Sequence, residues 1–193
     1  RPYVEMTLRA LALFGVKADI QNIPGGQAFR TPGHIKVEGD WSNGAFFLAA
    51  RVLGSDVQVT GLDEASCQGD RAAADLLPAL KDHCTISAAD IPDLVPILAV
   101  VAAANQGAVF THIQRLRLKE SDRVASVIAM VEALGGKAEA SEDSLTVYGT
   151  GLTGGTVQSC NDHRIAMAAA IAATVCTHPV TILDAQCVNK SYP

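Results

Sequence analysis

The strongest constraint in this sequence is the recurrence of an apolar, Ala-rich helical segment followed by a short β-branched strand. The pattern occurs at residues 43–52 before 57–60, 92–104 before 108–110, and 162–175 before 180–183. Amphipathic helices are predicted at residues 4–14, 71–81 and 122–134, with strands after them at 16–20, 84–86, 137–140 and 145–148. This repeated order of elements predicts an α/β fold built of βαβαββ units.

The two kinds of helix predict which layer lies inside. In the segment 122–134, apolar residues recur at three- and four-residue spacing, which places them on one face, and Gly135-Gly136 supplies the stop. The helices expected to start at Pro92 and Asp162 are instead apolar nearly all round. Helices of that kind are buried on all sides, so we expect buried helices and outward-facing sheets.

Composition narrows the classes of function. The net charge of -5 argues against a general nucleic-acid or membrane-surface binder. The five cysteines include no C-x-x-C pair, which favours reduced thiols in a cytoplasmic protein over disulfides or zinc. No apolar run reaches membrane-spanning length without a charge, Gly or Pro, and no signal peptide is visible.

Both ends of the sequence suggest a piece of a longer polypeptide. The chain starts at Arg1-Pro2-Tyr3 without a Met and moves straight into a helix. A length of 193 residues suits one domain plus part of another. We expect the break near Gly39-Asp40, where a strand-like stretch ends.

The first cluster with chemical potential is Lys119-Glu120-Ser121-Asp122-Arg123. Lys119 and Arg123 are four residues apart, so both are expected on one side of the first turn of a helix. Cations there oppose the helix dipole by about 0.3–1 kcal/mol each, which suggests that they have an anion to bind. A solvated capping turn, neutralised by Glu120 and Asp122, remains the alternative.

Asn161-Asp162-His163-Arg164 repeats this situation at a second helix. Asn161 or Asp162 is a good N-cap, and Arg164 again stands where the dipole disfavours it. An arginine holds a carboxylate or phosphate with two parallel hydrogen bonds. His163 could carry a proton, although a supporting hydrogen bond fits better because no nucleophile or paired base stands beside it. No metal site is expected, since no second His or Cys stands at ligand spacing.

Asp93 follows Pro92 at the expected start of the middle apolar helix, where it could simply stabilise the helix end. All three apolar helices, however, begin with polar groups at equivalent points of the repeat: Asp40 and Ser42-Asn43, Asp93, and Asn161 to Arg164. Converging N-termini would form an electropositive floor for anions. A lone carboxylate on that floor is a candidate base for a hydroxyl proton. Lys190, taken by itself, is expected to face solvent.

The combination of motifs closely resembles the 5-enolpyruvylshikimate-3-phosphate synthase family. The motifs that carry the resemblance occur in order along the chain: Arg1-Pro2-Tyr3, Val37 to Asp40, Gln68-Gly69-Asp70, Ile91-Pro92-Asp93, Lys119 to Arg123, Asn161 to Arg164 and Lys190 to Pro193. The two charged clusters are the most specific of them. The resemblance covers about the second half of the family's usual polypeptide.

The resemblance implies transfer of the enolpyruvyl group of phosphoenolpyruvate to the 5-hydroxyl of shikimate 3-phosphate. Asp93 would be the base and Glu120 would transfer a proton at the phosphoenolpyruvate methylene. The implied substrate-binding residues are Tyr3 and Lys119 for shikimate 3-phosphate, and Arg123, Arg164 and Lys190 for phosphoenolpyruvate, with His163 beside them. Fixed cations, and no metal or organic cofactor, suit two polyanions.

The implied fold is an inside-out α/β barrel pair. Residues 1–38 would be the tail of the N-terminal lobe and residues 39–193 most of the C-terminal lobe. The full-length enzyme would be a cytoplasmic monomer with no nucleic-acid or membrane partner, and this chain alone is expected to be inactive.

Two departures and two alternatives accompany this interpretation. Trp41 stands where a small residue is expected, and Arg115 stands where some relatives carry an Asn that contacts the substrate phosphate, so that contact is not carried over. The sister enzyme that uses UDP-N-acetylglucosamine as acceptor is one alternative; the Lys119 cluster, Arg164 and Lys190 favour the shikimate enzyme. A non-catalytic, anion-binding lobe is the other.

Overall fold

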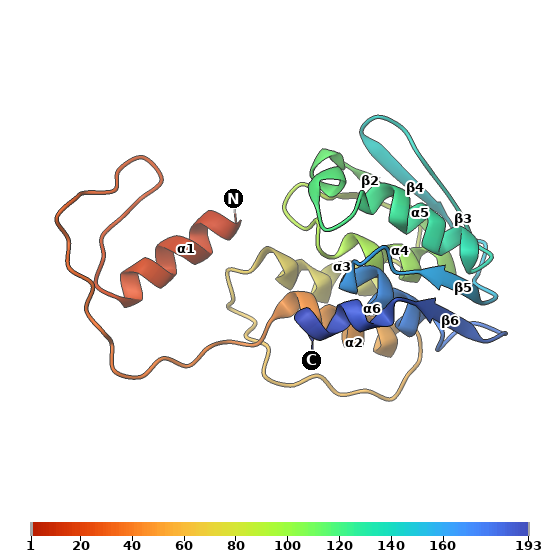
Figure 1. Cartoon of the computed structure of the whole chain (residues 1–193), viewed down its shortest axis with the longest axis horizontal. Coiled ribbons are helices and arrows are strands. Elements are labelled where there is room, and N and C mark those ends of the chain that lie inside the picture. Colours follow the sequence, from red (N-terminus) through yellow and green to blue (C-terminus); the bar gives the residue numbers. More distant parts are fainter. Residues whose placement is uncertain (1, 193) are drawn as a thin grey trace.

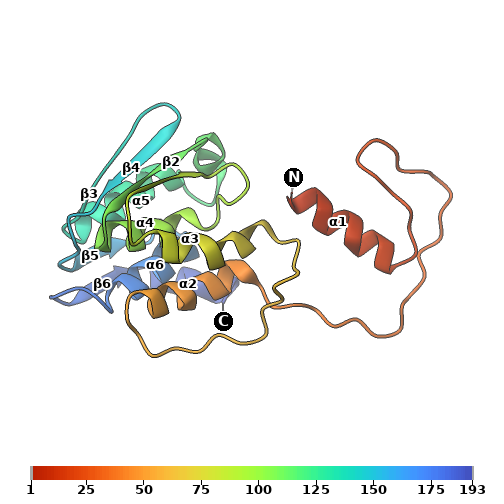
Figure 2. The same cartoon turned by 180° about the vertical axis from the view of Figure 1, so that it is seen from behind.

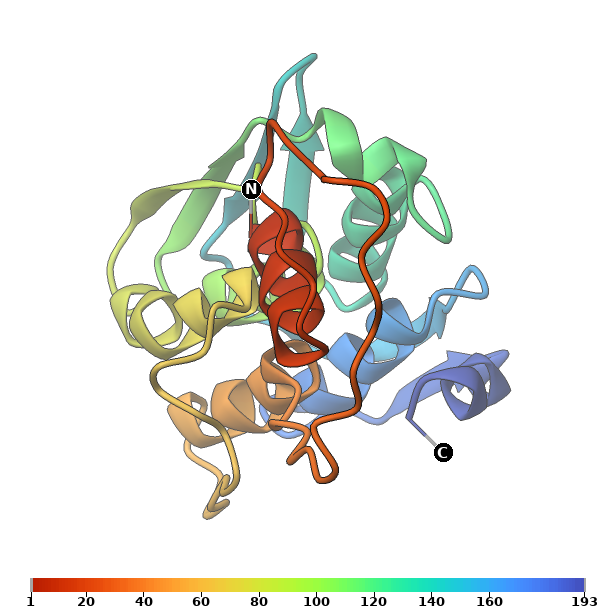
Figure 3. The ribbon, with the colours of Figure 1, turned by 90° about the vertical axis from the view of Figure 1, so that its left-hand side faces the viewer.

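The structure is a computed structural model that describes residues 2–192. Arg1 and Pro193, the outer residues of two of the family motifs, lie outside this range. Helix α1 (Pro2–Leu13) stands apart from the rest of the chain and is joined to it by residues 14–40, which form no helix or strand (Figure 1). The remaining elements form one layered body. The N-terminal end of α1 lies against this body (Figures 1 and 3).

The body contains α-helices, short 3-10 helices and short strands. In chain order these are α2 (Trp41–Val52), η1 (Gly69–Ala72), α3 (Ala73–Ala79), β1 (Cys84–Ser87), α4 (Val95–Ala104), β2 (Gly107–Thr111), η2 (Gln114–Leu118), α5 (Arg123–Ala133), β3 (Lys137–Ala140), β4 (Ser144–Tyr148), β5 (Gly155–Gln158), α6 (His163–Ala172), β6 (Val180–Leu183) and η3 (Ala185–Lys190). Within residues 2–192, no helix combines the length and the apolar character needed to cross a bilayer.

One complete βαβαββ unit is present, as the sequence predicts. It runs β1-α4-β2-α5-β3-β4, and its strands form a sheet in the order β1-β2-β4-β3. β1 and β2 are parallel, while β4 pairs antiparallel with both β2 and β3. A second, two-stranded sheet joins β5 and β6 in parallel across α6, in the same β-α-β order.

The helices lie inside and the sheets outside, as predicted. α4 carries no charged side chain and is buried from Val95 to Ala103. It contacts α2, α5 and α6 as well as β2 and β4, which makes it the centre of the core. α6 is buried along most of its length, with Ala170 exposed. Figure 2 shows the four-stranded sheet on the outside of this helical layer.

Several predicted elements differ from the structure. Residues 16–20 and 57–60 are not strands, because no segment within residues 2–192 pairs with them and a lone strand leaves its backbone groups without partners. The helix expected from Pro92 starts at Val95, after a turn in which Leu94 N–H donates to Ile91 O. The helix expected to reach residue 175 ends at Ala172. β5, which lies in a Gly-rich stretch, was not predicted.

Candidate functional site

The N-terminal ends of α2, α4 and α6 meet on one face of the body. Arg164 of α6 bridges them, since its Nη2 donates to Ser42 Oγ of α2 at 3.2 Å and lies 3.6 Å from Asp93 Oδ2 in the turn before α4. Asp40 caps α2 and Asp162 caps α6, each accepting a backbone N–H of the first turn. The predicted convergence is therefore confirmed.

Asp93 lies at the centre of this face. Its carboxylate accepts hydrogen bonds from Arg123 Nη1 at 2.7 Å and Tyr3 Oη at 3.2 Å, and lies 3.0 Å from Lys119 Nζ. Burial works to raise the pKa of Asp93, but Arg164, Lys119 and Arg123 outweigh it and lower the pKa to about 2. In this arrangement Asp93 is ionised and serves as a hydrogen-bond acceptor.

Tyr3 links α1 to the same face of the body. Besides its bond to Asp93, its ring lies under the Arg115 guanidinium, 5.6 Å from the ring centroid, and Arg115 also donates to Ala89 O at 3.0 Å. Burial and the charge of Asp93 both raise the pKa of Tyr3, so the phenol stays protonated. Of the proposed substrate ligands, Tyr3 is the one that comes from outside the body.

The cations of the 119–123 cluster do not share one helical turn, so that expectation is wrong. α5 starts at Arg123, with Asp122 as N-cap accepting from Val124 N–H at 3.1 Å and Ala125 N–H at 3.2 Å. Lys119 lies outside the helix, at the end of η2. The strong Asp122 cap sets this boundary, because its side chain satisfies two N–H groups at the helix start.

Arg123 is fully buried and every one of its N–H groups has a protein acceptor. Nε and Nη2 bond to Asp162 at 2.9 and 3.4 Å, Nη2 to Glu120 at 2.6 Å, and Nη1 to Asp93 at 2.7 Å and Pro92 O at 3.4 Å. Burial acts to lower the pKa of Arg123, but its bonds to Asp162 and Asp93 raise it. Arg123 therefore ties α4, α5 and α6 together and presents no free donor in this arrangement.

Arg164, unlike Arg123, has side-chain donors without a protein acceptor among the described residues. Its side chain is 12 % exposed, yet its Nε and Nη1 are buried without a hydrogen-bond partner. The adjacent His163 is also buried, and its Nδ1 has no partner. Burial, aided by the charge of Arg164, lowers the pKa of His163 and favours the neutral ring. Buried donors without partners are uncommon in folded proteins, and two on one guanidinium have the chemistry to bind an anion.

The remaining predicted residues lie around this centre. Glu120 forms its ion pair with Arg123 while its side chain stays 38 % exposed. Lys190 ends η3 and donates from Nζ to Asn161 O at 3.1 Å, next to the start of α6. Lys190 is exposed to solvent, as expected, and its contact with Asn161 also places it at the edge of the site. The structure brings all eight predicted residues to one region.

Asp70 is a site residue to which sequence reasoning gave no role. It is 8 % exposed, and its Oδ1 is buried without a hydrogen-bond partner. Burial, together with the charge of Asp93, raises the pKa of Asp70 to about 6. Gly69 places it there: a Cβ at residue 69 would lie 2.6 Å from Asp90 O. The only signal in the sequence was the Gln68-Gly69-Asp70 motif.

Comparison with known proteins shows which family the chain matches. The model of the EPSP synthase (3-phosphoshikimate 1-carboxyvinyltransferase) family matches residues 1–193. A 3-phosphoshikimate 1-carboxyvinyltransferase of Clostridium novyi is 41% identical over 214 residues, covering 99% of this chain and 49% of the relative. That of Clostridium acetobutylicum is 40% identical over 215 residues, covering 99% of this chain and 50% of the relative.

Solved structures give the same fold. An EPSP synthase of Acinetobacter baumannii matches with a TM-score of 0.66 and 24% identity, covering 100% of this chain and 52% of that one. A second structure of the enzyme from the same organism matches with a TM-score of 0.63 and 22% identity. The chain thus spans about half the length of the relatives that it matches. Matched along its whole length by the family model, and built with the family's buried helices and outer sheets, the chain belongs to the EPSP synthase family.

Proposed function

We propose that this chain supplies the C-terminal part of an active site that transfers the enolpyruvyl group of phosphoenolpyruvate to the 5-hydroxyl of shikimate 3-phosphate. The oxygen of the hydroxyl attacks C2 while C3 gains a proton, which gives a tetrahedral intermediate. Loss of a proton from C3 and cleavage of the C2–O bond to phosphate then restore the double bond and release phosphate. The observation that carries the proposal is Arg164, whose Nε and Nη1 are buried and unpartnered.

The remaining roles are those that the resemblance to the family implies for these positions. Arg164 and Lys190 would hold phosphoenolpyruvate, with His163 beside them, and Lys119 and Tyr3 would contact shikimate 3-phosphate. Anions of the substrates would draw Lys119 and Arg164 away from Asp93. Because these cations lower the pKa of Asp93 to about 2, their diversion would raise its basicity toward that of a general base.

Arg123 and Glu120 act as a pair in this proposal. The resemblance implies that Arg123 holds phosphoenolpyruvate. Because its donors are occupied by Asp93, Glu120 and Asp162, its proposed part is instead to position these carboxylates. Glu120 is the more exposed partner and is the candidate for proton transfer at C3. Fixed cations at helix N-termini stabilise charge that develops on the departing phosphate.

The proposed division of the chain into two parts implies a site shared between two lobes. We propose that residues 1–38 belong with an N-terminal lobe and residues 39–193 form most of the C-terminal lobe, since α1 stands apart from the body. The N-terminal lobe would provide the other cations that grip the substrates. The full-length enzyme in this proposal is a cytoplasmic monomer, and the five free cysteines of the chain accord with a reducing compartment.

Complementation tests the proposal. The chain alone should release no phosphate from the two substrates, whereas mixing it with the N-terminal half of the Clostridium novyi relative should restore release. The Arg164→Ala variant should fold but lose at least about a hundredfold in kcat/KM, because two buried donors are lost. Arg117→Ala, at an exposed ion pair with Asp122, is the matched control and should keep activity.

The outcomes separate the alternatives. Phosphate release with UDP-N-acetylglucosamine as acceptor, in place of shikimate 3-phosphate, would assign the chain to the sister reaction. Binding of phosphoenolpyruvate without turnover in any complemented mixture would leave an anion-binding lobe. Full activity of Arg164→Ala would contradict the role of this guanidinium.

A further inference from the structure

Two segments that are distant in the chain meet beside the start of α6. Residues 159–162 connect β5 to α6, and residues 183–190 run from the end of β6 through η3 to Lys190. β5 and β6 are parallel neighbours, so both strands end at the same edge of their sheet. Arg164 and Lys190, the two cations proposed to hold phosphoenolpyruvate, are therefore carried by adjacent parts of the chain.

Ser159 links these two segments and is fully buried. Its Oγ donates to Asp184 O at 3.1 Å and accepts from Asn161 N–H at 3.3 Å. Its backbone N–H donates to Leu183 O at 3.3 Å, and its carbonyl accepts from Asp162 N–H at 3.0 Å. Each polar group of Ser159 is thus bonded, and two of these bonds cross from one segment to the other.

The backbone around Ser159 adopts the left-handed conformation at three positions. Cys160, Asn161 and Asp184 have φ values of 54°, 56° and 54°. They are three of the four non-glycine residues with positive φ within residues 2–192, the fourth being His112. Such residues keep this conformation where surrounding bonds hold them, typically at functional sites. The hydroxyl of Ser159 bonds to the backbone of two of the three, so it helps to hold this geometry.

The position of Lys190 depends on the same two backbone groups. Lys190 ends η3, which begins after Asp184, and Asp184 O also accepts from Cys187 N–H at 3.2 Å. At the other end of its side chain, Lys190 Nζ donates to Asn161 O at 3.1 Å. Ser159 therefore fixes both the start of the helix that carries Lys190 and the residue whose carbonyl receives its ammonium group.

Little else holds the Lys190 ammonium in place. The residue is exposed and lines a cavity of about 600 Å³ together with Asn161, Asp184 and Cys187. Within residues 2–192 its Nζ forms this one hydrogen bond and no ion pair. Because a flexible lysine must lose rotamer freedom when it binds an anion, a lysine that is held beforehand binds the anion more tightly.

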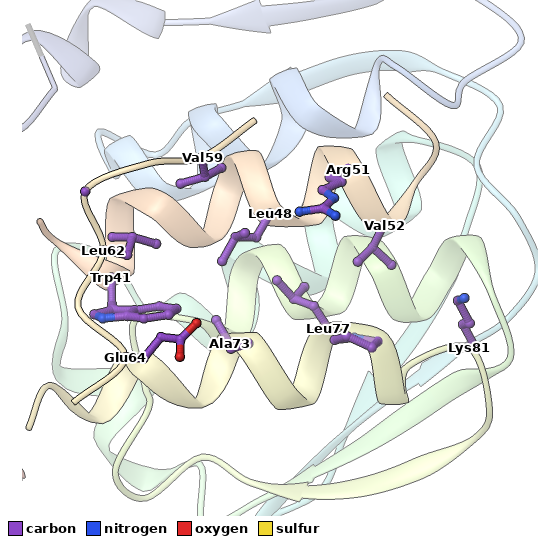
Figure 4. A pocket seen from close by; sticks show the side chains of 13 residues that line it. Trp41, Leu48, Arg51, Val52, Val59, Leu62, Glu64, Ala73, Leu77 and Lys81 are labelled. Carbon is purple, nitrogen blue, oxygen red and sulfur yellow. The ribbon is translucent and has the colours of Figure 1, made fainter. Parts of the chain in front are cut away.

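Beyond Lys190 the chain rests on α2. The ring centroid of Tyr192 lies 6.0 Å from that of Phe47. Leu48, the next residue of α2, instead faces the groove that α2 forms with α3 (Figure 4), so Tyr192 packs on a different side of α2. The segment that carries Lys190 is therefore anchored on both sides, by Ser159 before it and by Tyr192 after it.

We propose that Ser159 is a positioning residue, which holds Lys190 toward the phosphoenolpyruvate site by fixing Asp184 and Asn161. This role rests on the one proposed for Lys190, and it adds a buried residue that the substrates do not touch. Removing the hydroxyl leaves Asn161 N–H without its acceptor and Asp184 O with the N–H of Cys187 alone. Lys190 then samples more positions, which weakens binding of the anion.

Chemical labelling of lysines tests the contact without any turnover. In Ser159→Ala, an amine-reactive acetylating reagent should modify Lys190 at least about twofold faster than in the parent, because the ammonium spends less time bonded. Peptide mass spectrometry measures the rate, and Lys17 on the arm should react equally in both. A parental rate at Lys190 in Ser159→Ala would overturn the proposal.

Thr153→Val is the matched control. Thr153 Oγ1 also donates to a carbonyl of another segment, Leu134 O at 3.2 Å, but it stands before β5 whereas Ser159 follows that strand. The variant removes a comparable hydroxyl at the end of β5 away from Lys190. Labelling of Lys190 should therefore keep its parental rate.

Kinetics of the complemented mixture test the consequence for the substrate. Ser159→Ala should raise KM for phosphoenolpyruvate about three- to tenfold, while kcat and KM for shikimate 3-phosphate change less than about twofold. Lys190→Ala should also raise KM for phosphoenolpyruvate. Adding Ser159→Ala to Lys190→Ala should raise it little further, because Ser159 acts through Lys190. Thr153→Val should keep the parental values.

The outcomes separate this role from the function on which it rests. The same factor in KM with and without Lys190 would show that Ser159 acts elsewhere and would overturn the proposal, as would a loss of stability with KM unchanged. An unchanged KM in Lys190→Ala would refute the role of Lys190 and this one with it. A parent mixture without turnover would count against the proposed function, whereas labelling would still decide whether Ser159 holds Lys190.

Discussion

Two arginines define the site at the scale of single residues. Arg123 has all its donors bound to protein acceptors, whereas Arg164 keeps Nε and Nη1 buried without partners. Both follow an Asp N-cap at the start of a helix, so their local sequence contexts are alike. Arg123 therefore links three elements of the site, whereas Arg164 keeps two donors that have no acceptor among the described residues.

Arg123→Met tests the organising role. The change leaves Asp93, Glu120 and Asp162 close together without their shared cation, and removing one partner of a buried ion pair costs about 3–5 kcal/mol. Urea unfolding should show this loss. Arg117→Met, at an exposed pair, should cost less than about 1 kcal/mol. Similar losses for the two variants would contradict the assignment.

Asp70 gives a pH-dependent prediction. Its pKa is raised from 3.8 to about 6, so between these values the folded chain holds a proton that the unfolded chain has released. The stabilising effect of this proton is complete below about pH 3.8 and is lost as pH rises through about 6. At about pH 8 an ionised, buried Asp70 therefore destabilises the fold by an amount on the order of 2–3 kcal/mol.

Asp70→Asn should remove that penalty. The variant should be more stable than the parent at about pH 8, and the difference should vanish near pH 3.5, where both side chains are neutral. Urea titrations at the two pH values measure it. The neighbours Asp93, Asp40, Lys119 and Arg164 are unchanged and serve as internal controls. A variant less stable than the parent at about pH 8 would show that the Asp70 carboxylate has a stabilising partner.

At the scale of elements, helix ends and close backbone contacts set the geometry of the site. Asp40, Asp122 and Asp162 cap α2, α5 and α6, and each capped end faces the same region. The turn before α4 supplies Asp93 and is held by the backbone approach of Gly69 to Asp90. This close backbone contact fixes the position of the turn more tightly than the packing of the helices alone would.

Gly69→Ala tests this contact. The new Cβ would lie 2.6 Å from Asp90 O and 3.0 Å from Pro2 Cγ, so the turn and α1 must move apart, at a cost of about 1–3 kcal/mol. Gly25→Ala is the control, because nothing lies within 4 Å of its new Cβ. Chemical denaturation should show a loss for residue 69 and almost none for residue 25. Equal stability of the two variants would mean that the contact relaxes freely.

At the scale of the whole molecule, the arm of residues 2–38 differs from the body. Ten of the thirteen exposed large apolar side chains in residues 2–192 lie between Tyr3 and Val37. α1 has no buried residue, and its side-chain hydrogen bond and cation–π contact with the body come from Tyr3. An apolar surface of this extent on one segment is typical of an element that packs against another lobe.

Deleting residues 1–38 should therefore leave the fold of the body intact. We expect a cooperative thermal transition within a few degrees of that of the parent, because the core lies in α2 to β6. Binding of an apolar dye and self-association on a sizing column should both fall, since most exposed apolar side chains are removed. Loss of the cooperative transition would contradict the division at residue 38 and show that the arm is part of the core.

The sequence predicted the fold of the complete unit from β1 to β4 well and that of the residues before β1 less well. The helix and hairpin at residues 122–148 were predicted because apolar spacing and Gly135-Gly136 act over a few residues. Residues 57–60 have the composition of a strand but remain unpaired, because pairing requires a second segment that local sequence does not reveal.

The sequence by itself determined the periodicities, the caps and the meeting of three helix N-termini, because each depends on neighbours within a turn or two or on the repeat of elements. Only the tertiary structure decided which charges are free. Arg123 meets Asp93 and Asp162 across 30 and 39 residues of chain, and such contacts satisfy its donors while leaving those of Arg164 unpartnered. Ion pairing in a buried site depends on distances between elements, which residue spacing along the chain does not contain.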